Sequence, residues 1–167
     1  LWGVVLNAVG TVPRLRIARI ALLVCAHLVL ARSFLSAFSS LGIPDIHRVG
    51  RSVVVAAVVA GAFLPAVWLP QTPGYNDMAV IIIVLLSAIT FRLRVESWSL
   101  RRRNLLTAAG ALTWFLFMSR FGSIFVLAPL SAVVYLGTTR AGIRVARDTA
   151  TFAVGVALGM VTTHLLL

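Results

Sequence analysis

The sequence predicts an all-α, polytopic integral membrane helical bundle, and three observations predict it. Hydrophobic residues make up 60% of the 167-residue chain and charged residues only 11%, whereas soluble domains have about a quarter charged residues. All fifteen Lys or Arg positions are arginine, and they lie in clusters between long apolar runs. Because about 20 apolar residues are needed to cross the hydrocarbon core as a helix, we expect about six membrane segments in a single transmembrane domain, 1–167.

Residues 17–43 are the hardest part of the chain to interpret. They contain two apolar stretches, 20–31 and 33–43, that are each too short to cross a membrane. They form either a re-entrant hairpin shielded by protein or one long tilted helix. The single helix would place Arg32 near mid-membrane, which is costly unless Arg32 is paired or hydrated. We favour the hairpin, because the arginine clusters before and after it then lie on the same side.

From residue 52 onward the pattern is regular, with apolar runs that end at arginines, prolines or tight turns. The predicted spans are 52–69, 78–95, 104–119, 124–138 and 149–167, and residues 1–12 form a partial span that Pro13 ends. Two prolines, Pro65 and Pro129, lie within predicted spans. We expect each of them to kink its helix.

The arginines predict the orientation of these spans. If alternate loops face the same side, Arg48, Arg51 and the arginines of loops 92–103 and 138–148 place ten on one side. The loops on the other side, 70–77 and 119–123, contain only Arg120. Since basic residues near span ends stay in the cytoplasm, loops 92–103 and 138–148 are predicted to be cytoplasmic. The exclusive use of arginine, with abundant Ala, Val and Gly, suggests a GC-rich bacterial genome and hence a bacterial inner membrane.

Some of these arginines are candidates for contacts with anions or lipid head groups, because guanidinium forks fit phosphate and carboxylate groups. Arg140, Arg144 and Arg147 are spaced i, i+4, i+7 and therefore share one helix face. The predicted contacts are Arg48, Arg51, Arg140, Arg144 and Arg147. The alternative is that they only anchor the topology. Arg-Val-x-Arg occurs at both 48–51 and 144–147, which is a weak indication of an internal duplication.

Small residues predict close contacts between helices. Gly155 and Gly159 form a Gly-x-x-x-Gly pattern, and Ala57 and Gly61 form a weaker version of it. Such spacing lets two helix backbones approach each other.

The sequence predicts no cofactor. His27 and His164 lie in apolar segments, where a pair of histidines could ligate a haem. No further ligand motif accompanies them, so we expect each to bond a neighbouring helix or to lie at the interface. Cys25 is the only cysteine, which excludes a cysteine metal cluster and an intrachain disulfide.

Two functional hypotheses follow from these observations. The first is a non-catalytic membrane subunit of a larger complex, favoured by the small size and by acidic residues that fall only in loops or at span ends. The second is a small transporter or channel for an anionic or apolar solute. No motif supports an enzyme, and the absence of lysine excludes a P-loop and Schiff-base chemistry.

The predicted partners are membrane lipids, chiefly anionic head groups on the cytoplasmic side, and other membrane subunits or further copies of the chain. The net charge of +11 could also suggest nucleic acid. A nucleic-acid-binding module needs a polar, solvated surface, which this composition does not provide.

The stretch from about 100 to 167 resembles the membrane half of fusaric-acid or aromatic-acid exporters. The likeness lies in Arg101-Arg-Arg-Asn-Leu-Leu-Thr-Ala-Ala-Gly-Ala-Leu and in Thr-Arg-Ala-Gly-Ile-Arg-Val-Ala-Arg before a glycine-bearing span. It covers about two-fifths of the chain, and we assign no family from it.

Overall fold

The computed structural model describes residues 11–40, 48–64, 75–119 and 142–166. These ranges are helical and contain no strand, so the prediction of an all-α protein is confirmed for this part of the chain. The elements are α2 (Val12–Ser40), α3 (Arg48–Ala60), the short 3-10 helix η1 (Gly61–Phe63), α5 (Tyr75–Val95), α6 (Leu100–Ser119) and α8 (Gly142–Leu166). Three of them contain stretches that are long and apolar enough to cross a membrane: Pro13–Ser40, Asn76–Val95 and Val145–Leu165.

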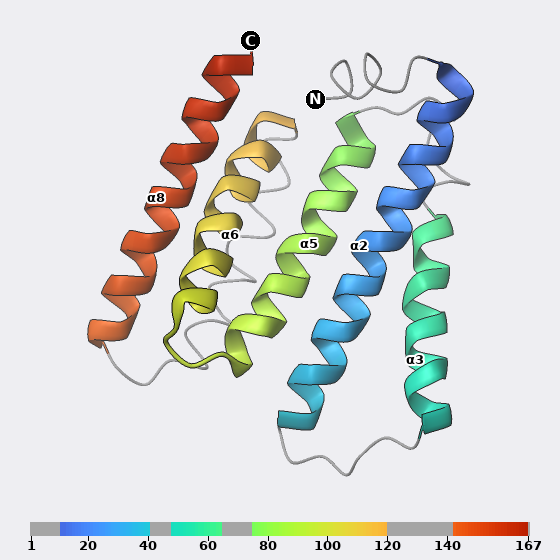
Figure 1. The fold of residues 1–167 in the computed structure, drawn as a ribbon, viewed down its shortest axis with the longest axis horizontal. Coiled ribbons are helices and arrows are strands. Elements are labelled where there is room, and N and C mark those ends of the chain that lie inside the picture. Colours follow the sequence, from blue (N-terminus) through green and yellow to red (C-terminus); the bar gives the residue numbers. More distant parts are fainter. Residues whose placement is uncertain (1–10, 41–47, 65–74, 120–141, 167) are drawn as a thin grey trace.

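The described helices stand side by side in a row, in the order α3, α2, α5, α6, α8 (Figure 1). Helices α2 and α5 run in one direction, and α3, α6 and α8 run in the other. The row therefore contains two parallel pairs, α2/α5 and α6/α8, and α5 meets α6 antiparallel between them. We call the edge where α2 and α5 end the arginine-rich edge, because α3, α6 and α8 begin there with their arginine clusters.

Helix α2 is continuous over 29 residues, so the favoured re-entrant hairpin over 17–43 is wrong and the single long helix is observed. The stretch between Pro13 and Ser40 contains neither glycine nor proline, so nothing in it breaks a helix. The serines of this segment are accommodated within the helix. The Ser33 hydroxyl, for example, donates to the Val29 carbonyl at 2.8 Å. Pro13 lies in the first turn of α2, where a missing N–H costs nothing.

The other helices begin before the predicted spans. The structure has α5 where the sequence predicts 78–95, α6 where it predicts 104–119, and α8 where it predicts 149–167. In α3, α6 and α8 the arginines that directly precede the apolar run already belong to the helix. The hydroxyl of Ser99 caps α6 by accepting from the Arg102 backbone N–H at 3.3 Å. Helices α3 and η1 cover the first part of the span 52–69. Pro65, Pro129, the span 124–138 and most of the partial span 1–12 lie outside the described residues.

Large apolar side chains cover much of the outside of the row. Only 17% to 33% of each membrane-length apolar stretch is buried. The outer helix α8 exposes Val154, Leu158, Val161 and Leu165, which recur every three to four residues. A surface this apolar is stable in lipid or against other subunits rather than in water. The described part of the chain therefore supports the prediction of a membrane protein.

Five hydroxyl side chains within the helices are satisfied by their own helix. Their side-chain oxygens donate to the carbonyl four residues earlier, at 2.8 to 2.9 Å. The residues concerned are Ser33, Ser87, Thr90, Thr113 and Thr162. Helices that leave few polar groups unsatisfied suit a hydrocarbon environment.

Candidate functional site

A buried ion pair joins α2 to α5 at the edge opposite the arginine-rich edge. Arg19 lies in the second turn of α2 and Asp77 in the first turn of α5, and the parallel packing of the two helices brings them together. The Oδ1 atom of Asp77 accepts from Arg19 Nη2 at 2.8 Å and from Arg19 Nε at 2.9 Å. The side chains are only 4% and 2% exposed, so the pair is shielded from solvent and strongly coupled.

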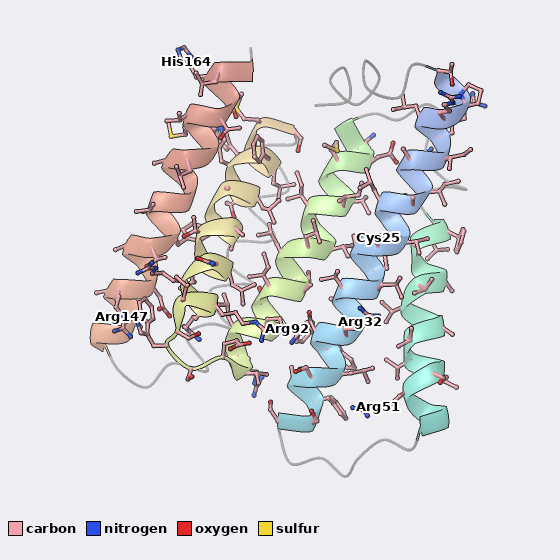
Figure 2. The ribbon with its side chains drawn as sticks, in the orientation of Figure 1. Cys25, Arg32, Arg51, Arg92, Arg147 and His164 are labelled. Atoms are coloured by element: carbon pink, nitrogen blue, oxygen red, sulfur yellow. The ribbon has the colours of Figure 1, made fainter. Side chains whose placement is uncertain are left out.

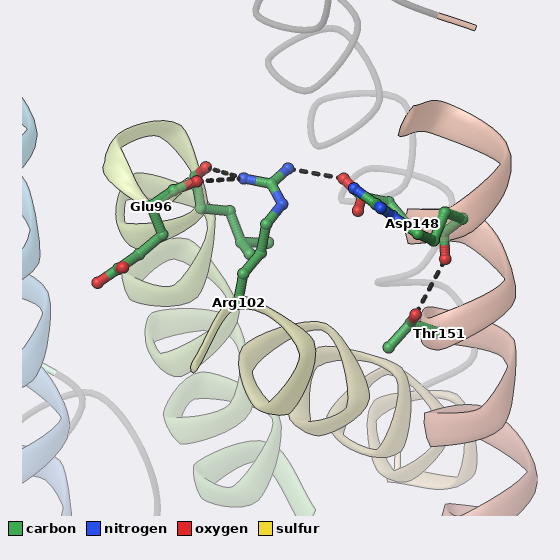
Figure 3. A network of polar contacts seen from close by, with 6 residues as sticks. Glu96, Arg102, Asp148 and Thr151 are labelled. Carbon is green, nitrogen blue, oxygen red and sulfur yellow. Dashed lines mark hydrogen bonds and ion pairs between the residues drawn. The ribbon is translucent and has the colours of Figure 1, made fainter. Parts of the chain in front are cut away.

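A second ion pair joins α6 to α8 at the arginine-rich edge (Figure 3). Arg102 Nη2 donates to Asp148 Oδ2 at 2.6 Å, and Asp148 is 2% exposed. The same guanidinium donates through Nη1 to the carbonyls of Leu93 and Glu96, at 2.6 and 2.8 Å. Arg102 therefore holds three elements together: the end of α5, the start of α6 and the start of α8.

Residues around this second pair form further contacts at the arginine-rich edge. The Arg147 guanidinium carbon lies 3.4 Å from the centroid of the Trp98 ring, a cation–π contact between α8 and the α5–α6 connection. Arg101 forms an ion pair with Glu96 at 3.1 Å. Arg101 is 65% exposed, so this outer pair contributes little to stability.

Glycines bring the backbones of α6 and α8 into contact. A Cβ placed on Gly155 would collide with the Thr107 carbonyl oxygen, and one on Gly110 would collide with the Phe152 carbonyl oxygen. A Cβ on Gly159 would lie 3.0 Å from the Trp114 Cβ. The predicted Gly-x-x-x-Gly pattern thus lies against α6 of the same chain. Beyond it, Trp114 Nε1 donates to Thr163 Oγ1 at 3.1 Å.

The far end of the α2/α5 pair has a different polar contact. Arg92 Nε donates to Ser33 Oγ at 3.3 Å, and Phe34 meets Phe91 edge to face with ring centroids 5.4 Å apart. Each parallel pair of helices therefore has a polar contact near both ends. One is an arginine–aspartate ion pair, and the other is a weaker hydrogen bond, Arg92–Ser33 or Trp114–Thr163.

The arginines predicted to bind anions do not form one site. Arg51 in the first turn of α3 and Arg147 near the start of α8 are exposed at the arginine-rich edge, at opposite ends of the row (Figure 2). Arg48 begins α3 and Arg144 belongs to the first turn of α8. Arg140 lies outside the described residues. The two Arg-Val-x-Arg segments thus begin helices that run in the same direction along the two outer sides of the row.

The two histidines also lie far apart. His27 is buried in α2, where its Nδ1 is 2.8 Å from the Leu23 carbonyl oxygen, and its ring lies 3.7 Å from the position of a Cβ on Gly61. His164 is exposed near the end of α8, with α5 and α6 between it and α2 (Figure 2). One copy of the chain therefore does not bring them together as a pair of haem ligands. Gly61 faces α2, while Ala57 is exposed.

Sequence reasoning missed both arginine–aspartate pairs, because the acidic residues were assigned to loops or span ends. Asp77 and Asp148 do lie near helix starts, but they are buried. One signal could have identified the first pair. The cluster of Arg14, Arg16 and Arg19 violates the topology rule if α2 crosses once, and Asp77 is the only acidic residue predicted on the same side.

The chain matches no protein-family model, no curated protein and no solved structure. Within the described ranges, no group of three or more His, Cys, Asp or Glu residues is arranged to hold a metal ion. The chemistry of the described site is that of paired charges, which link neighbouring helices.

Proposed function

We propose that this chain is a multi-pass integral membrane protein of about six segments that acts as a non-catalytic membrane subunit of a larger complex. The observation that carries the proposal is the apolar exterior of the helix row. A row of helices with apolar residues on its outer helices can bind lipid on one side and other subunits on the other.

The polar contacts of the described residues support a structural role. Asp77 and Asp148 both pair with arginine, and both pairs lie between neighbouring helices of the chain itself. Side chains used in this way hold the row in one arrangement.

In the proposed topology the arginine-rich edge faces the cytoplasm of a bacterial cell. Ser119 at the end of α6 and Gly142 at the start of α8 lie at opposite edges of the row, which agrees with a crossing at the proposed span 124–138. With α2 crossing once, Arg14, Arg16 and Arg19 lie outside. Pairing with Asp77 reduces the cost of placing Arg19 there.

Purification of the intact chain in mild detergent tests the proposed function. We expect partner subunits to co-purify in fixed stoichiometry. A stable homo-oligomer that moves solute in liposomes would contradict the subunit role.

The topology can be tested by labelling with a membrane-impermeant maleimide, because Cys25 is the only native cysteine. In a Cys25→Ala background we expect Thr72→Cys to react in intact cells. Ser97→Cys, placed between α5 and α6, is expected to react only after lysis. The reverse pattern would overturn the orientation.

A small transporter for an anionic solute is the second candidate, and one observation favours it. Buried ion pairs between helices occur along transport pathways, because a charged solute can compete for one partner. Solute flux that is abolished by Asp77→Asn in a correctly inserted protein would support this candidate over the subunit role.

A further inference from the structure

We propose that Arg32 and Arg92 form a binding site for the phosphate of an anionic phospholipid, on the seam between α2 and α5. This inference rests on the membrane placement in the proposed function. It does not depend on a role as a subunit or as a transporter.

The two arginines come from neighbouring helices and lie at the same height (Figure 2). The Nε atom of Arg92 donates to the hydroxyl of Ser33 at 3.3 Å, and Ser33 directly follows Arg32 in α2. The Ser33 hydroxyl donates in turn to the Val29 carbonyl. Ser33 therefore holds Arg92 through Nε, and the Nη groups of that guanidinium remain available for a ligand.

Neither guanidinium has an acidic partner in the part of the chain that the structure describes. The ion pairs there are Arg19–Asp77, Arg101–Glu96 and Arg102–Asp148. The other two interhelical arginines, Arg19 and Arg102, each have an aspartate. Arg92 occupies an equivalent place at an interhelical seam, but a serine stands where they have a carboxylate.

The surface around Arg32 is apolar. Leu22, Cys25 and Val29 lie on the same side of α2, at steps of three to four residues, and all are exposed. Arg32 is exposed at the end of this apolar stripe, eight residues before α2 ends, or about 12 Å of helix. An arginine that faces lipid at this depth is costly without a counter-charge.

A phosphate group meets the requirements of such a site. It offers several acceptor oxygens to the planar guanidinium fork, and two arginines can bind it from two directions. Phospholipid phosphates lie at the membrane boundary, within reach of arginine side chains that snorkel toward it. The same chemistry would fit free inorganic phosphate, so the experiment must separate the two sources.

Native mass spectrometry of the intact chain in detergent tests the proposal. The protein is mixed with equal amounts of phosphatidylglycerol and phosphatidylcholine, and we expect preferential retention of one phosphatidylglycerol. In the Arg32→Gln/Arg92→Gln variant this preference is expected to fall about tenfold or more, since charge-assisted hydrogen bonds are lost.

Matched variants distinguish a specific phosphate site from a general effect of positive charge on lipid binding. Arg94→Gln removes the same charge from an exposed position two residues beyond Arg92, and we expect it to change the preference by less than about twofold. Ser33→Ala keeps both charges but releases Arg92, and it is expected to have an intermediate effect. Arg92→Lys, which keeps the charge and loses the fork, should also be intermediate.

Inorganic phosphate alone is the second arm. If millimolar phosphate fails to displace phosphatidylglycerol, the site takes its phosphate from lipid, as proposed. If phosphate displaces the lipid and binds without it, the oxyanion site stands and the lipid source is overturned. An equal preference for the two lipids, or an equal loss in Arg94→Gln and in the double variant, would overturn the site.

These outcomes are independent of the proposed function. A chain that inserts and co-purifies with partners, but shows no lipid preference, contradicts only this inference. A chain without partners that retains phosphatidylglycerol contradicts only the subunit role.

Discussion

The two parallel helix pairs of this molecule are held together in different ways. Helices α6 and α8 touch through backbone, because Gly110, Gly155 and Gly159 leave no room between them. Helices α2 and α5 pack through side chains such as Leu23 and Ile81. Both pairs carry a buried arginine–aspartate contact near their N-terminal ends.

The difference indicates how each pair resists disruption. In α6/α8 two backbone carbonyls accept from Arg102, and close backbone contacts at the glycines follow farther along the two helices. The ion pair is therefore one of several contacts that hold α6 and α8 together. In α2/α5 the more deeply buried Arg19–Asp77 pair lies at an edge where the described glycines make no contact. We therefore expect the stability of the α2/α5 pair to depend mainly on its ion pair, and that of the α6/α8 pair to depend mainly on close packing of the two backbones.

The largest effect is expected from Asp77→Asn. It removes the carboxylate charge that accepts two hydrogen bonds from buried Arg19, and we expect the free energy of unfolding to fall by about 3–5 kcal/mol. Asp148→Asn should cost about half as much, because Arg102 is more exposed and keeps its bonds to two backbone carbonyls. Unfolding in mixed micelles, with increasing fractions of denaturing detergent, measures both losses.

Glu96→Gln is the control for this comparison. It removes only the outer pair with Arg101 and should cost no more than about 1 kcal/mol. Equal losses for Asp77→Asn and Asp148→Asn would contradict the greater dependence of α2/α5 on charge.

Gly155→Ala is expected to have the next largest effect. The new methyl group would meet the Thr107 carbonyl, so α8 must move away from α6, at a cost of about 1–3 kcal/mol. Gly61→Ala is the matched control on the other side of the row. Its Cβ would only touch the His27 ring at 3.7 Å, and we expect a change within about 0.5 kcal/mol. If Gly155→Ala and Gly61→Ala lose the same stability, close backbone packing does not distinguish the α6/α8 pair from the other side of the row.

The smallest effects are expected at the far ends of the two pairs. Thr163→Val removes the acceptor of the Trp114 N–H, and we expect a loss of about 0.6 kcal/mol, typical of hydrogen bonds between membrane helices. Tryptophan fluorescence during the same unfolding titration can follow this change. A loss as large as that of Asp148→Asn would show that the far contact matters as much as the ion pair.

Much of the helical layout could be predicted from the sequence, because apolar runs and arginine clusters are local signals. The exact ends of the helices are harder to predict. The sequence places Arg101, Arg102 and Arg103 in a loop, but they lie in the first turn of α6, directly after the Ser99 cap. The hairpin in 17–43 was wrong for a related reason. The arginine clusters before and after it favour a hairpin that keeps both on one side of the membrane, whereas a single helix continues through Arg32.

The polar contacts could not be predicted, because they join residues that are distant in the sequence. The misplaced arginine cluster that contains Arg19 indicates a need for a counter-charge, but no local pattern identifies Asp77 as its partner or Asp148 as the partner of Arg102. Only the parallel packing of α2 with α5 and of α6 with α8 brings them together. The glycine pattern of α8 predicted a close contact but not its partner, since the complementary glycine of α6, Gly110, stands alone in its helix.

The spacing of the two ion pairs also sets an order in time during synthesis. In both pairs the arginine is made first, and its aspartate follows 58 or 46 residues later. At about 5–20 residues per second, each arginine waits on the order of 2–12 seconds for its partner. Until Asp77 leaves the ribosome, the start of α2 carries a cation with no counter-charge from α5. Helix α2 can therefore reach its final position only after α5 has been made, although α2 precedes the other described helices in the sequence.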